Sequence, residues 1–225
     1  MARGSHLPLR ALGNEIESCT SCPRLVTWRE EVARAKRAAY CNEVYWGRPV
    51  SGFGDPSARI VFLGLAPGAH GANRTGRVFT GDRSGEWLYR ALHRAGLANQ
   101  PNSFARDDGL ELRGAWVSVA VRCAPPGNTP TRDERRRCAP FLALELALLD
   151  SARTVVCLGA FALAALCEVV ALRPRPRFAH GALLRVGRFD VVCSYHPSQQ
   201  NTFTGTLTEP MLDNVVATAV RLAAM

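Results

Sequence analysis

Four short apolar runs, separated by longer stretches with helical patterning, constrain the fold of this chain more than any other feature. The runs lie at 60–65, 115–121, 154–158 and 189–195, and the helical stretches at 23–38, 84–96, 131–149, 159–172 and 208–224. Strands that alternate with helices of this length form βαβ units, so the strands are parallel and helices cover both faces of the sheet. The pattern therefore predicts an α/β fold. Its 225 residues fit one domain spanning 1–225.

The most hydropathic stretch, residues 154–172, approaches the length of a membrane span and carries one charge, Glu168. Gly159 divides it into a β-branched run and an Ala- and Leu-rich run. That division is typical of a buried strand that leads into a helix, so we do not expect a membrane span. The first twelve residues contain no apolar region of the length that a secretory signal needs. We therefore expect a cytoplasmic protein.

The chain carries an excess of positive charge, with 28 basic against 19 acidic residues and a net charge of +9. Such an excess favours polyanionic partners, namely nucleic acid or an anionic membrane surface. All the basic residues except Lys36 are arginines, however, and a coding bias would produce the same enrichment. The charge alone therefore does not decide the partner.

The eight cysteines fall into two groups by their surroundings. In the first group, Cys157, Cys167 and Cys193 lie in apolar runs, where small core residues are expected, and Cys41 stands alone in a loop. The other four stand in polar, turn-rich segments: Cys19, Cys22, Cys123 and Cys138. Four such thiolates can form a tetrahedral site, and both zinc and an iron–sulfur cluster fit that ligand set. The 14 residues between the last two cysteines favour a cluster over zinc.

In an open parallel sheet, the loops at the carboxyl ends of the strands meet at one edge and hold functional groups. Four segments follow the predicted strands here: residues 66–82, 122–130, 159 onward and 196–205. Three of the four also contain the chain's concentrations of polar and glycine residues. Topology and composition therefore predict the same functional edge.

The first of these loops, within residues 64–82, is rich in glycine, so its backbone N–H groups can approach a ligand closely. Arg74 and Arg77 add donors suited to phosphate. The loop is neither a dinucleotide fingerprint nor a P-loop, because it lacks both the G-x-G-x-x-G spacing and a Gly-Lys-Ser/Thr sequence. Phe79 is either a stacking surface for a flat ring or an anchor in the core. Asp82 is either an N-cap of the following helix or a carboxylate presented at the site.

Two other polar loops each offer one candidate side chain. The amide of Asn128 can present an acceptor and a donor to a base edge, although Asn in a Gly-Asn turn is more often a turn residue. His196 directly follows the last strand and opens a polar loop, so a structural and a catalytic role are both open.

Taken together, these segments resemble the uracil-DNA glycosylase superfamily, and most closely its family 5, the type B enzymes that carry an iron–sulfur cluster. The resemblance rests on five blocks that together span nearly the whole chain: Cys19-x-x-Cys22, Gly64 to Asp82, Arg122 to Asn128, Cys138, and His196 to Asn201. It implies a three-layer α/β/α sandwich with a central four-stranded parallel sheet. It also implies excision of uracil from DNA. A [4Fe-4S] cluster is implied as well, with an N-terminal ligating segment at about residues 15–40 and the ligands Cys19, Cys22, Cys123 and Cys138.

Position by position, the resemblance assigns roles to residues of these loops. Phe79 is similar to the ring that stacks on the extruded base, and Asn128 to the amide that reads it. His196 is similar to the histidine that hydrogen-bonds a base oxygen and stabilises the departing anion. Ala66 and Gly68 are the remaining implied contacts of the base. The implied DNA contacts are His70, Arg74, Ser198, Gln199, Gln200 and Asn201.

Two positions depart from the superfamily pattern. Several sister families carry a polar residue in the strand-end motif to position the attacking water, whereas residues 66–69 offer no polar side chain. By resemblance to family 5, we assign water positioning to Asp82, secondary to stabilisation of the leaving base. Relatives often place a leucine wedge where this chain has Gln200, so strand opening depends on polar filling of the gap or on another residue. The resemblance to family 5 further implies a less selective pocket that accepts hypoxanthine and related deaminated or damaged bases.

Two other functions fit parts of the sequence. A non-catalytic DNA-binding protein with an iron–sulfur cluster or zinc explains the charge and the cysteines, but not the three polar loops. An α/β enzyme acting on a small nucleotide explains Phe79 and Asn128, but not the excess positive charge. The preferred expectation is a monomeric, monofunctional DNA repair glycosylase that works at the nucleoid.

Overall fold

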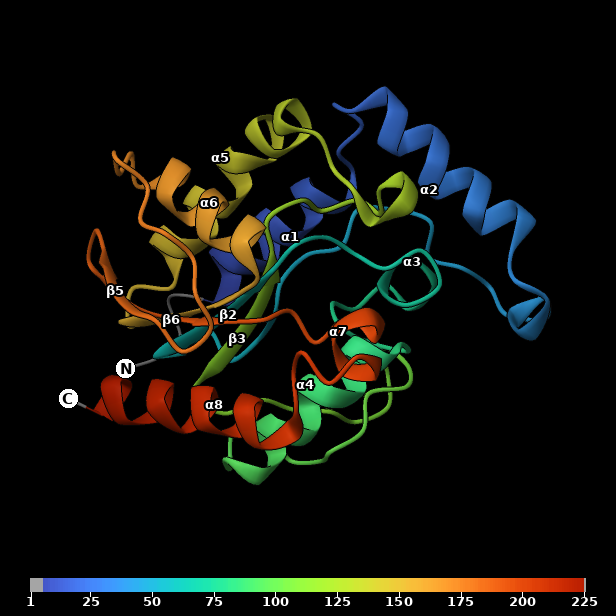
Figure 1. Ribbon diagram of the computed structural model, residues 1–225. Helices are drawn as coiled ribbons and strands as arrows, with labels where there is room; N and C mark the ends of the chain where they lie inside the picture. The colour runs from blue at the N-terminus through green and yellow to red at the C-terminus, as the bar shows by residue number, and fades with distance from the viewer. Residues whose placement is uncertain (1–5, 225) are drawn as a thin grey trace.

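A mixed six-stranded sheet forms the centre of the computed structural model, which describes residues 6–224 (Figure 1). In sheet order, the strands are β1 (Phe53–Gly54), β3 (Ala115–Val119), β2 (Ile60–Gly64), β4 (Thr154–Leu158), β6 (Phe189–Ser194) and β5 (Leu183–Val186). The four inner strands are parallel, as the sequence predicts, and nearly all their residues are buried.

Two antiparallel edge strands, β1 and β5, extend the four-stranded parallel sheet and are not predicted from the sequence. β1 has only two residues, and β5 is largely exposed. Neither therefore has the continuous apolar run that identifies a strand buried on both faces. β5 leads into β6 through a two-residue hairpin turn at Gly187 and Arg188.

Helices cover both faces of the sheet and complete the three-layer sandwich (Figure 1). One face is covered by α4 (Arg83–Arg94) and α8 (Glu209–Ala224), and the other by α1 (His6–Glu17), α5 (Arg132–Leu148) and α6 (Ala160–Val169). The remaining helices are α2 (Pro23–Ala35), α3 (Ala72–Thr75) and α7 (Gln199–Phe203), with 3-10 turns at Ala38–Tyr40 and Pro126–Asn128. The predicted helices are thus present, while α1, α3 and α7 are additions.

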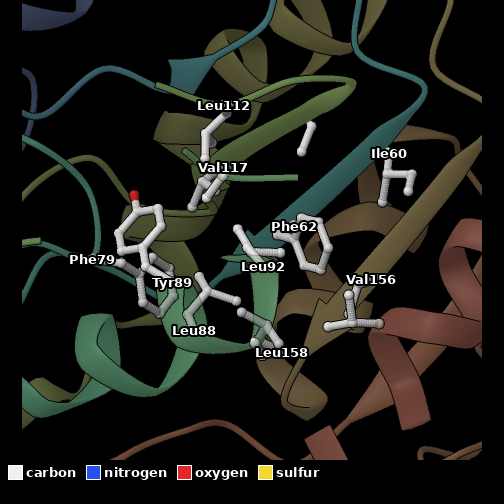
Figure 2. Packing of buried hydrophobic residues seen from close by; sticks show 14 of the residues in the cluster. Ile60, Phe62, Phe79, Leu88, Tyr89, Leu92, Leu112, Val117, Val156 and Leu158 are labelled. Carbon is white, nitrogen blue, oxygen red and sulfur yellow. The ribbon is translucent and has the colours of Figure 1, made fainter. Parts of the chain in front are cut away.

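Each face of the sheet has its own apolar core. Phe62 and Val156 point into the core beneath α4, where they lie with Leu88 and Leu92 (Figure 2). Val61, the neighbour of Phe62 in β2, belongs to the opposite core. Because successive strand residues point to opposite faces, a sheet with two covered faces requires uninterrupted apolar strands.

Local signals start several helices at the carboxyl edge of the sheet. The side chain of Asp82 caps α4, and Ser198 caps α7. Thr131 and Glu134 form a capping box at the start of α5. These caps fix the points at which the functional loops return to regular structure.

The hydropathic stretch at residues 154–172 forms β4 and α6, as the sequence analysis predicts. In the part of the chain that the structure describes, no helix has both the length and the apolar character that crossing a membrane requires. The stretch is hydropathic because β4 contributes to the cores on both faces of the sheet and α6 packs into one of them.

Candidate active site

The carboxyl ends of β2, β3 and β6 surround a small pocket of about 80 Å³. Its walls include all the residues assigned to the base pocket or to catalysis: Ala66, Gly68, Phe79, Asp82, Asn128 and His196. Mostly apolar residues complete the lining: Leu65, Pro67, Val78, Ser84 and Val119. Loops that are far apart in the sequence therefore converge on one space.

Phe79 forms one wall of the pocket and also belongs to the core. Its side chain is 6% exposed, and its ring lies against Gly64, where a Cβ atom would come within 2.6 Å of Cζ. The ring stacks on the imidazole of His196, with 5.8 Å between the ring centroids and 26° between the planes. The residue is thus a core anchor whose ring also borders the pocket.

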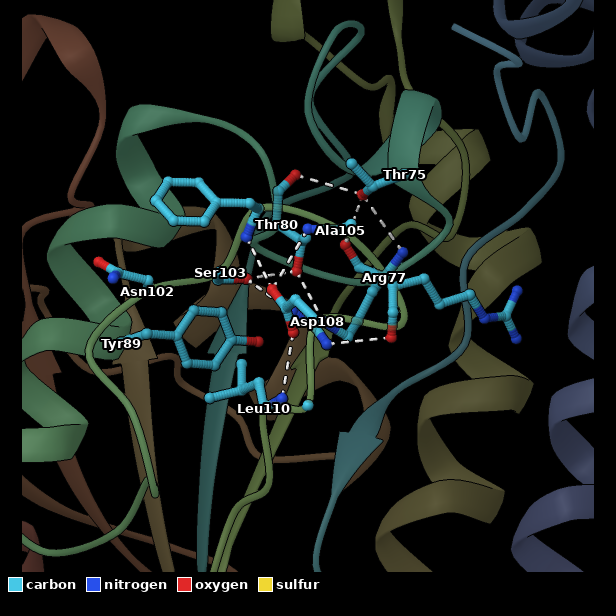
Figure 3. Close-up of polar contacts among 12 residues, drawn as sticks. Thr75, Arg77, Thr80, Tyr89, Asn102, Ser103, Ala105, Asp108 and Leu110 are labelled. Carbon is cyan, nitrogen blue, oxygen red and sulfur yellow. Dashed lines mark hydrogen bonds and ion pairs between the residues drawn. The ribbon is translucent and has the colours of Figure 1, made fainter.

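Hydrogen bonds hold Phe79 in a left-handed backbone conformation with φ of +51°. This conformation costs a non-glycine residue about 1 to 2 kcal/mol. The Tyr89 hydroxyl donates to the carbonyl of Val78 at 2.9 Å, and Ser103 Oγ donates to the carbonyl of Phe79 at 3.3 Å. Figure 3 shows Tyr89 and Ser103 beside Thr80, whose Oγ1 lies 2.7 Å from Ser103 Oγ. Tyr89 of α4 and Ser103 of the segment that follows α4 therefore fix the backbone that carries the ring.

That segment, residues 99–110, is termed the brace segment, and a buried ion pair anchors it (Figure 3). Arg77 Nη2 lies 2.8 Å from Asp108 Oδ2 and also donates to Ser103 Oγ. Asp108 accepts from the backbone N–H groups of Phe104, Ala105 and Leu110. Burial raises the pKa of Asp108, but the hydrogen bonds to it outweigh burial and hold the pKa below its ordinary value. Arg77 is thus a correction to the sequence analysis: its guanidinium braces the loop, because it is already paired inside the protein.

Asp82 fills both roles that the sequence leaves open. Its Oδ1 accepts the Gly85 N–H at 3.0 Å and so caps α4. Its Oδ2 lies so close to the preceding loop that a Cβ atom on Gly68 would come within 2.8 Å of it, and one on Gly71 would collide with it. Burial raises the pKa of Asp82, with the N–H groups of Gly85 and Ser84 acting in the opposite direction. A fixed carboxylate therefore stands in the pocket wall.

His196 lies at the start of the loop that follows β6, and residues at the start of α7 hold its backbone. Asn201 Nδ2 donates to the carbonyl of His196 at 2.8 Å, while Ser198 Oγ accepts the Asn201 N–H at 3.3 Å. Burial lowers the pKa of His196 to about 4. The imidazole is therefore neutral at neutral pH and can donate one hydrogen bond.

Asn128 lines the pocket from the loop after β3, and its side chain is otherwise exposed. Its backbone φ is +54°, a conformation that Asn adopts more readily than most residues. The residue is therefore both a turn residue and a pocket residue, so the two sequence interpretations are compatible.

The residues expected to contact DNA differ in how free their side chains are. Gln199 and Gln200 are exposed on α7, whereas Ser198 and Asn201 form the contacts that build the loop. Arg74, the expected phosphate donor, is mostly engaged inside the protein, and its contact with DNA stays a prediction. It is 9% exposed, pairs with Glu43, and donates to the carbonyls of His70 and Gly81. Its guanidinium therefore holds the glycine-rich loop together.

His70 lies half-buried beside this arginine. Its Nδ1 is hydrogen-bonded to the Tyr45 hydroxyl at 3.0 Å. Burial, followed by the charges of Arg37 and Arg74, lowers its pKa. Its other ring nitrogen has no hydrogen-bond partner among residues 6–224, so the expected DNA contact stays a prediction.

The four cysteines from polar segments gather at one place beside the pocket loops. Cys22, Cys123 and Cys138 meet in a small apolar cluster with Leu25 and Val121. Burial raises the pKa of these three thiols, and the charges of neighbouring thiols, including Cys19, raise it further. Within the described residues, no three His, Cys, Asp or Glu side chains are arranged to hold a single metal ion. The other four cysteines lie apart: Cys157, Cys167 and Cys193 in the core and Cys41 exposed.

Arg29 connects the cysteines to the glycine-rich loop. Its side chain is 3% exposed, and Nη1 donates to Cys123 Sγ at 3.1 Å and to the carbonyl of Cys19 at 3.2 Å. Asn73 Nδ2 in turn donates to the carbonyl of Arg29 at 3.2 Å. Sequence reasoning did not identify Arg29, Ser103 or Asp108, because their partners lie far away along the chain and no local motif marks them.

Comparison with known proteins gives a family match. The sequence model of the Uracil DNA glycosylase superfamily matches residues 51–219. The chain is 52% identical over 229 residues to a protein from Mycobacterium bovis named Type-5 uracil-DNA glycosylase, covering 98% of this chain and 82% of that protein. It is 52% identical to a protein of the same name from Thermus thermophilus, covering 93% and 96% of the two chains. The corresponding protein from Pyrobaculum aerophilum is 44% identical, with 92% and 89% covered.

Proposed function

This chain belongs to the uracil-DNA glycosylase superfamily, and we propose on that premise that it excises uracil from DNA by hydrolysing the N-glycosidic bond. The observation that carries the proposal is the pocket at the carboxyl edge. There a flat ring, an amide, a neutral imidazole and a carboxylate border one small space. The names of relatives that match over nearly the whole chain support an enzyme of this kind. Excision leaves an abasic site, which marks the DNA for repair.

The base reaches such a pocket only by leaving the duplex stack. We assign stacking to the ring of Phe79 and recognition of the base edge to the amide of Asn128. His196 donates a hydrogen bond to a base oxygen. When the bond between C1′ and the base nitrogen breaks, the electron pair stays on the base, and this hydrogen bond stabilises the resulting anion.

Asp82 acts on the water that replaces the base. Its carboxylate accepts a hydrogen bond from that water and takes a proton as the water oxygen bonds to C1′. The departing base takes up a proton from solvent. The sugar carries much positive charge before the water arrives, so we assign most of the rate to stabilisation of the base and less to Asp82.

A [4Fe-4S] cluster held by Cys19, Cys22, Cys123 and Cys138 is part of the proposal. The donor set consists of thiols alone, and the buried Arg29 guanidinium lies beside Cys123, which suits a thiolate ligand. Four cysteine thiolates are the usual ligands of such a cluster, so these four residues would hold it. Bound there, the cluster supplies structural order, since its ligands come from three separate segments.

The amide of Asn128 supports substrates other than uracil. Uracil and hypoxanthine each present a carbonyl oxygen beside a ring N–H. An amide that offers both an acceptor and a donor pairs with that edge in either base. We therefore propose that hypoxanthine and related deaminated bases are also substrates.

We further propose that the enzyme is a monomer. DNA as substrate supports action at the nucleoid. The non-catalytic alternative gains no support, because it leaves the convergence of the loops on this pocket without a purpose.

The test is base excision by the purified protein. Labelled oligonucleotides carrying uracil or hypoxanthine are incubated with the protein, treated with alkali and resolved by length. We expect cleavage at the modified base by the wild type and by Arg113→Gln, an exposed control, and strongly reduced cleavage by His196→Ala. Absence of cleavage by a folded wild type that still binds DNA would refute the enzyme and restore the non-catalytic function.

A further inference from the structure

A cleft lined only by charged side chains lies outside the pocket. It has a volume of about 520 Å³. The start of α5 forms one side, and the end of α6 and the segment after it form the other. The helices α5 and α6 lie side by side in Figure 1. We name it the arginine cleft, after its lining residues Arg132, Arg135, Arg136, Glu168, Arg173 and Arg175. Five positive charges and one negative charge therefore share one hollow.

Three of the five lining arginines have no ion-pair partner within the part of the chain that the structure describes. Arg135 pairs with Glu168 at 2.7 Å, and Arg136 pairs with Asp133 at 2.8 Å. For the other three lining arginines, the residues described, 6–224, provide no ion pair or side-chain hydrogen bond: Arg132, Arg173 and Arg175. All three are exposed. Gathering unpaired like charges is unfavourable unless an anion binds among them.

The cleft lies on the flank of the edge that carries the pocket. Arg135 lies over the ring of Phe161, with 5.2 Å between the guanidinium carbon and the ring centroid. Phe161 stands in the first turn of α6 and packs against the same apolar cluster as Ala66, a pocket residue. α5 itself begins three residues after Asn128, at its cap Thr131. A polymer held in the pocket can therefore continue toward the cleft.

We propose that the arginine cleft binds the phosphodiester backbone of the DNA that flanks the excised base. The inference rests on the proposed function, which makes DNA the substrate. Guanidinium groups match phosphate with paired hydrogen bonds, and they do so without reading sequence. An acidic protein is the weaker fit, because protein interfaces have an apolar centre and no apolar side chain lines this cleft.

The test compares two variants that remove the same charge from different places. Arg173→Gln/Arg175→Gln alters the cleft. Arg59→Gln/Arg113→Gln alters exposed arginines that precede β2 and β3, at the opposite edge of the sheet. Affinity is measured across a salt series for a uracil duplex of about 30 base pairs and for duplexes shortened on the 5′ or the 3′ side of the uracil. Single-turnover excision at saturating enzyme is measured in parallel.

On the long duplex, we expect the cleft variant to bind more weakly and to lose about 2 from the slope of log affinity against log salt, because each lost phosphate contact removes about 0.9. On one of the shortened duplexes, the cleft variant and the wild type should bind with the same affinity and the same salt slope. The control variant should match the wild type on every duplex. Saturated excision rates should be unchanged. Arg132→Gln alone should act in the same direction with about half the loss of slope.

A cleft variant with the wild-type salt slope on every duplex would overturn the proposal and leave an acidic protein as the partner to seek. Equal unfolding midpoints of all variants exclude misfolding as the cause of weaker binding. Failure of the proposed function would look different. Neither the wild type nor any variant would release a base from any duplex, while the affinities of the variants could still be compared.

Discussion

At the scale of single residues, burial changes the ordinary chemistry of two pocket side chains. It lowers the pKa of His196 and raises the pKa of Asp82. Both shifts arise because burial penalises the charged form, and the raised pKa makes the ionised carboxylate of Asp82 a stronger proton acceptor. For His196 the neutral form is the useful one at neutral pH, because it donates to the base without carrying a full charge before the bond breaks.

The protonation state of His196 can be read from the pH dependence of excision. With a pKa lowered to about 4, the imidazole stays neutral as the pH falls through 6.5 and is protonated only near pH 4. We expect His196→Asn to lower the single-turnover rate about 100-fold. The ratio of wild-type to variant rates should stay constant from about pH 8 to about pH 5.5. A ratio that changes with a midpoint near 6.5 would contradict this assignment.

Asp82 has separable roles in capping and in catalysis. Asn is as good an N-cap as Asp, so Asp82→Asn should keep the unfolding free energy while lowering the excision rate about 10-fold to 100-fold. Asp82→Ala should lose the same activity and also about 1 kcal/mol of stability. Chemical denaturation and single-turnover excision measure the two effects. Unchanged excision by Asp82→Asn would remove its role in positioning water.

At the scale of elements, the brace segment shows how a loop that does not itself line the pocket sets a pocket side chain. It fixes the carbonyl of Phe79 through Ser103 and is itself anchored by the Arg77–Asp108 ion pair. The left-handed backbone of Phe79 persists only because these contacts hold it. The position of the stacking ring is therefore a property of two loops together.

Removing Asp108 should release this anchor. Asp108→Ala leaves the buried Arg77 guanidinium without its carboxylate, so we expect a loss of about 3 kcal/mol in unfolding free energy. Weaker inhibition by free uracil should accompany it, because the Phe79 ring is no longer fixed. Asp108→Asn retains an acceptor and should lose less. The neighbouring exposed Asp107→Ala is the control, with an expected change below about 0.5 kcal/mol; an equal loss there would refute the anchoring role.

At the scale of the whole molecule, the four cysteines from polar segments bring together parts of the chain that the sheet does not connect. Two lie before and at the start of α2, one in the loop after β3, and one in α5. A cluster bound to all four would fix the N-terminal helices against the loop that carries Asn128. The same linkage would tie protein stability to the presence of iron.

Loss of one ligand should therefore affect colour and stability together. We expect the purified wild type to contain iron and to absorb visible light, and Cys138→Ser to lose both and to unfold at a lower temperature. Cys41→Ser, which changes an exposed cysteine outside the group, should match the wild type. Zinc with no visible absorbance in the wild type would contradict an iron–sulfur cluster.

The sequence by itself determined the four parallel strands, the helices between them and the edge that carries the site, because burial on both faces requires unbroken apolar runs and strand-end loops are local in sequence. It did not determine the edge strands, since β1 and β5 are too short or too exposed to leave such a pattern. Nor did it separate free arginines from paired ones. Arg74 and Arg77 are engaged with Glu43 and Asp108, whereas Arg173 and Arg175 have no ion-pair partner among residues 6–224. Only the tertiary structure decided this, because an ion pair depends on distances between residues that the order of the chain does not specify.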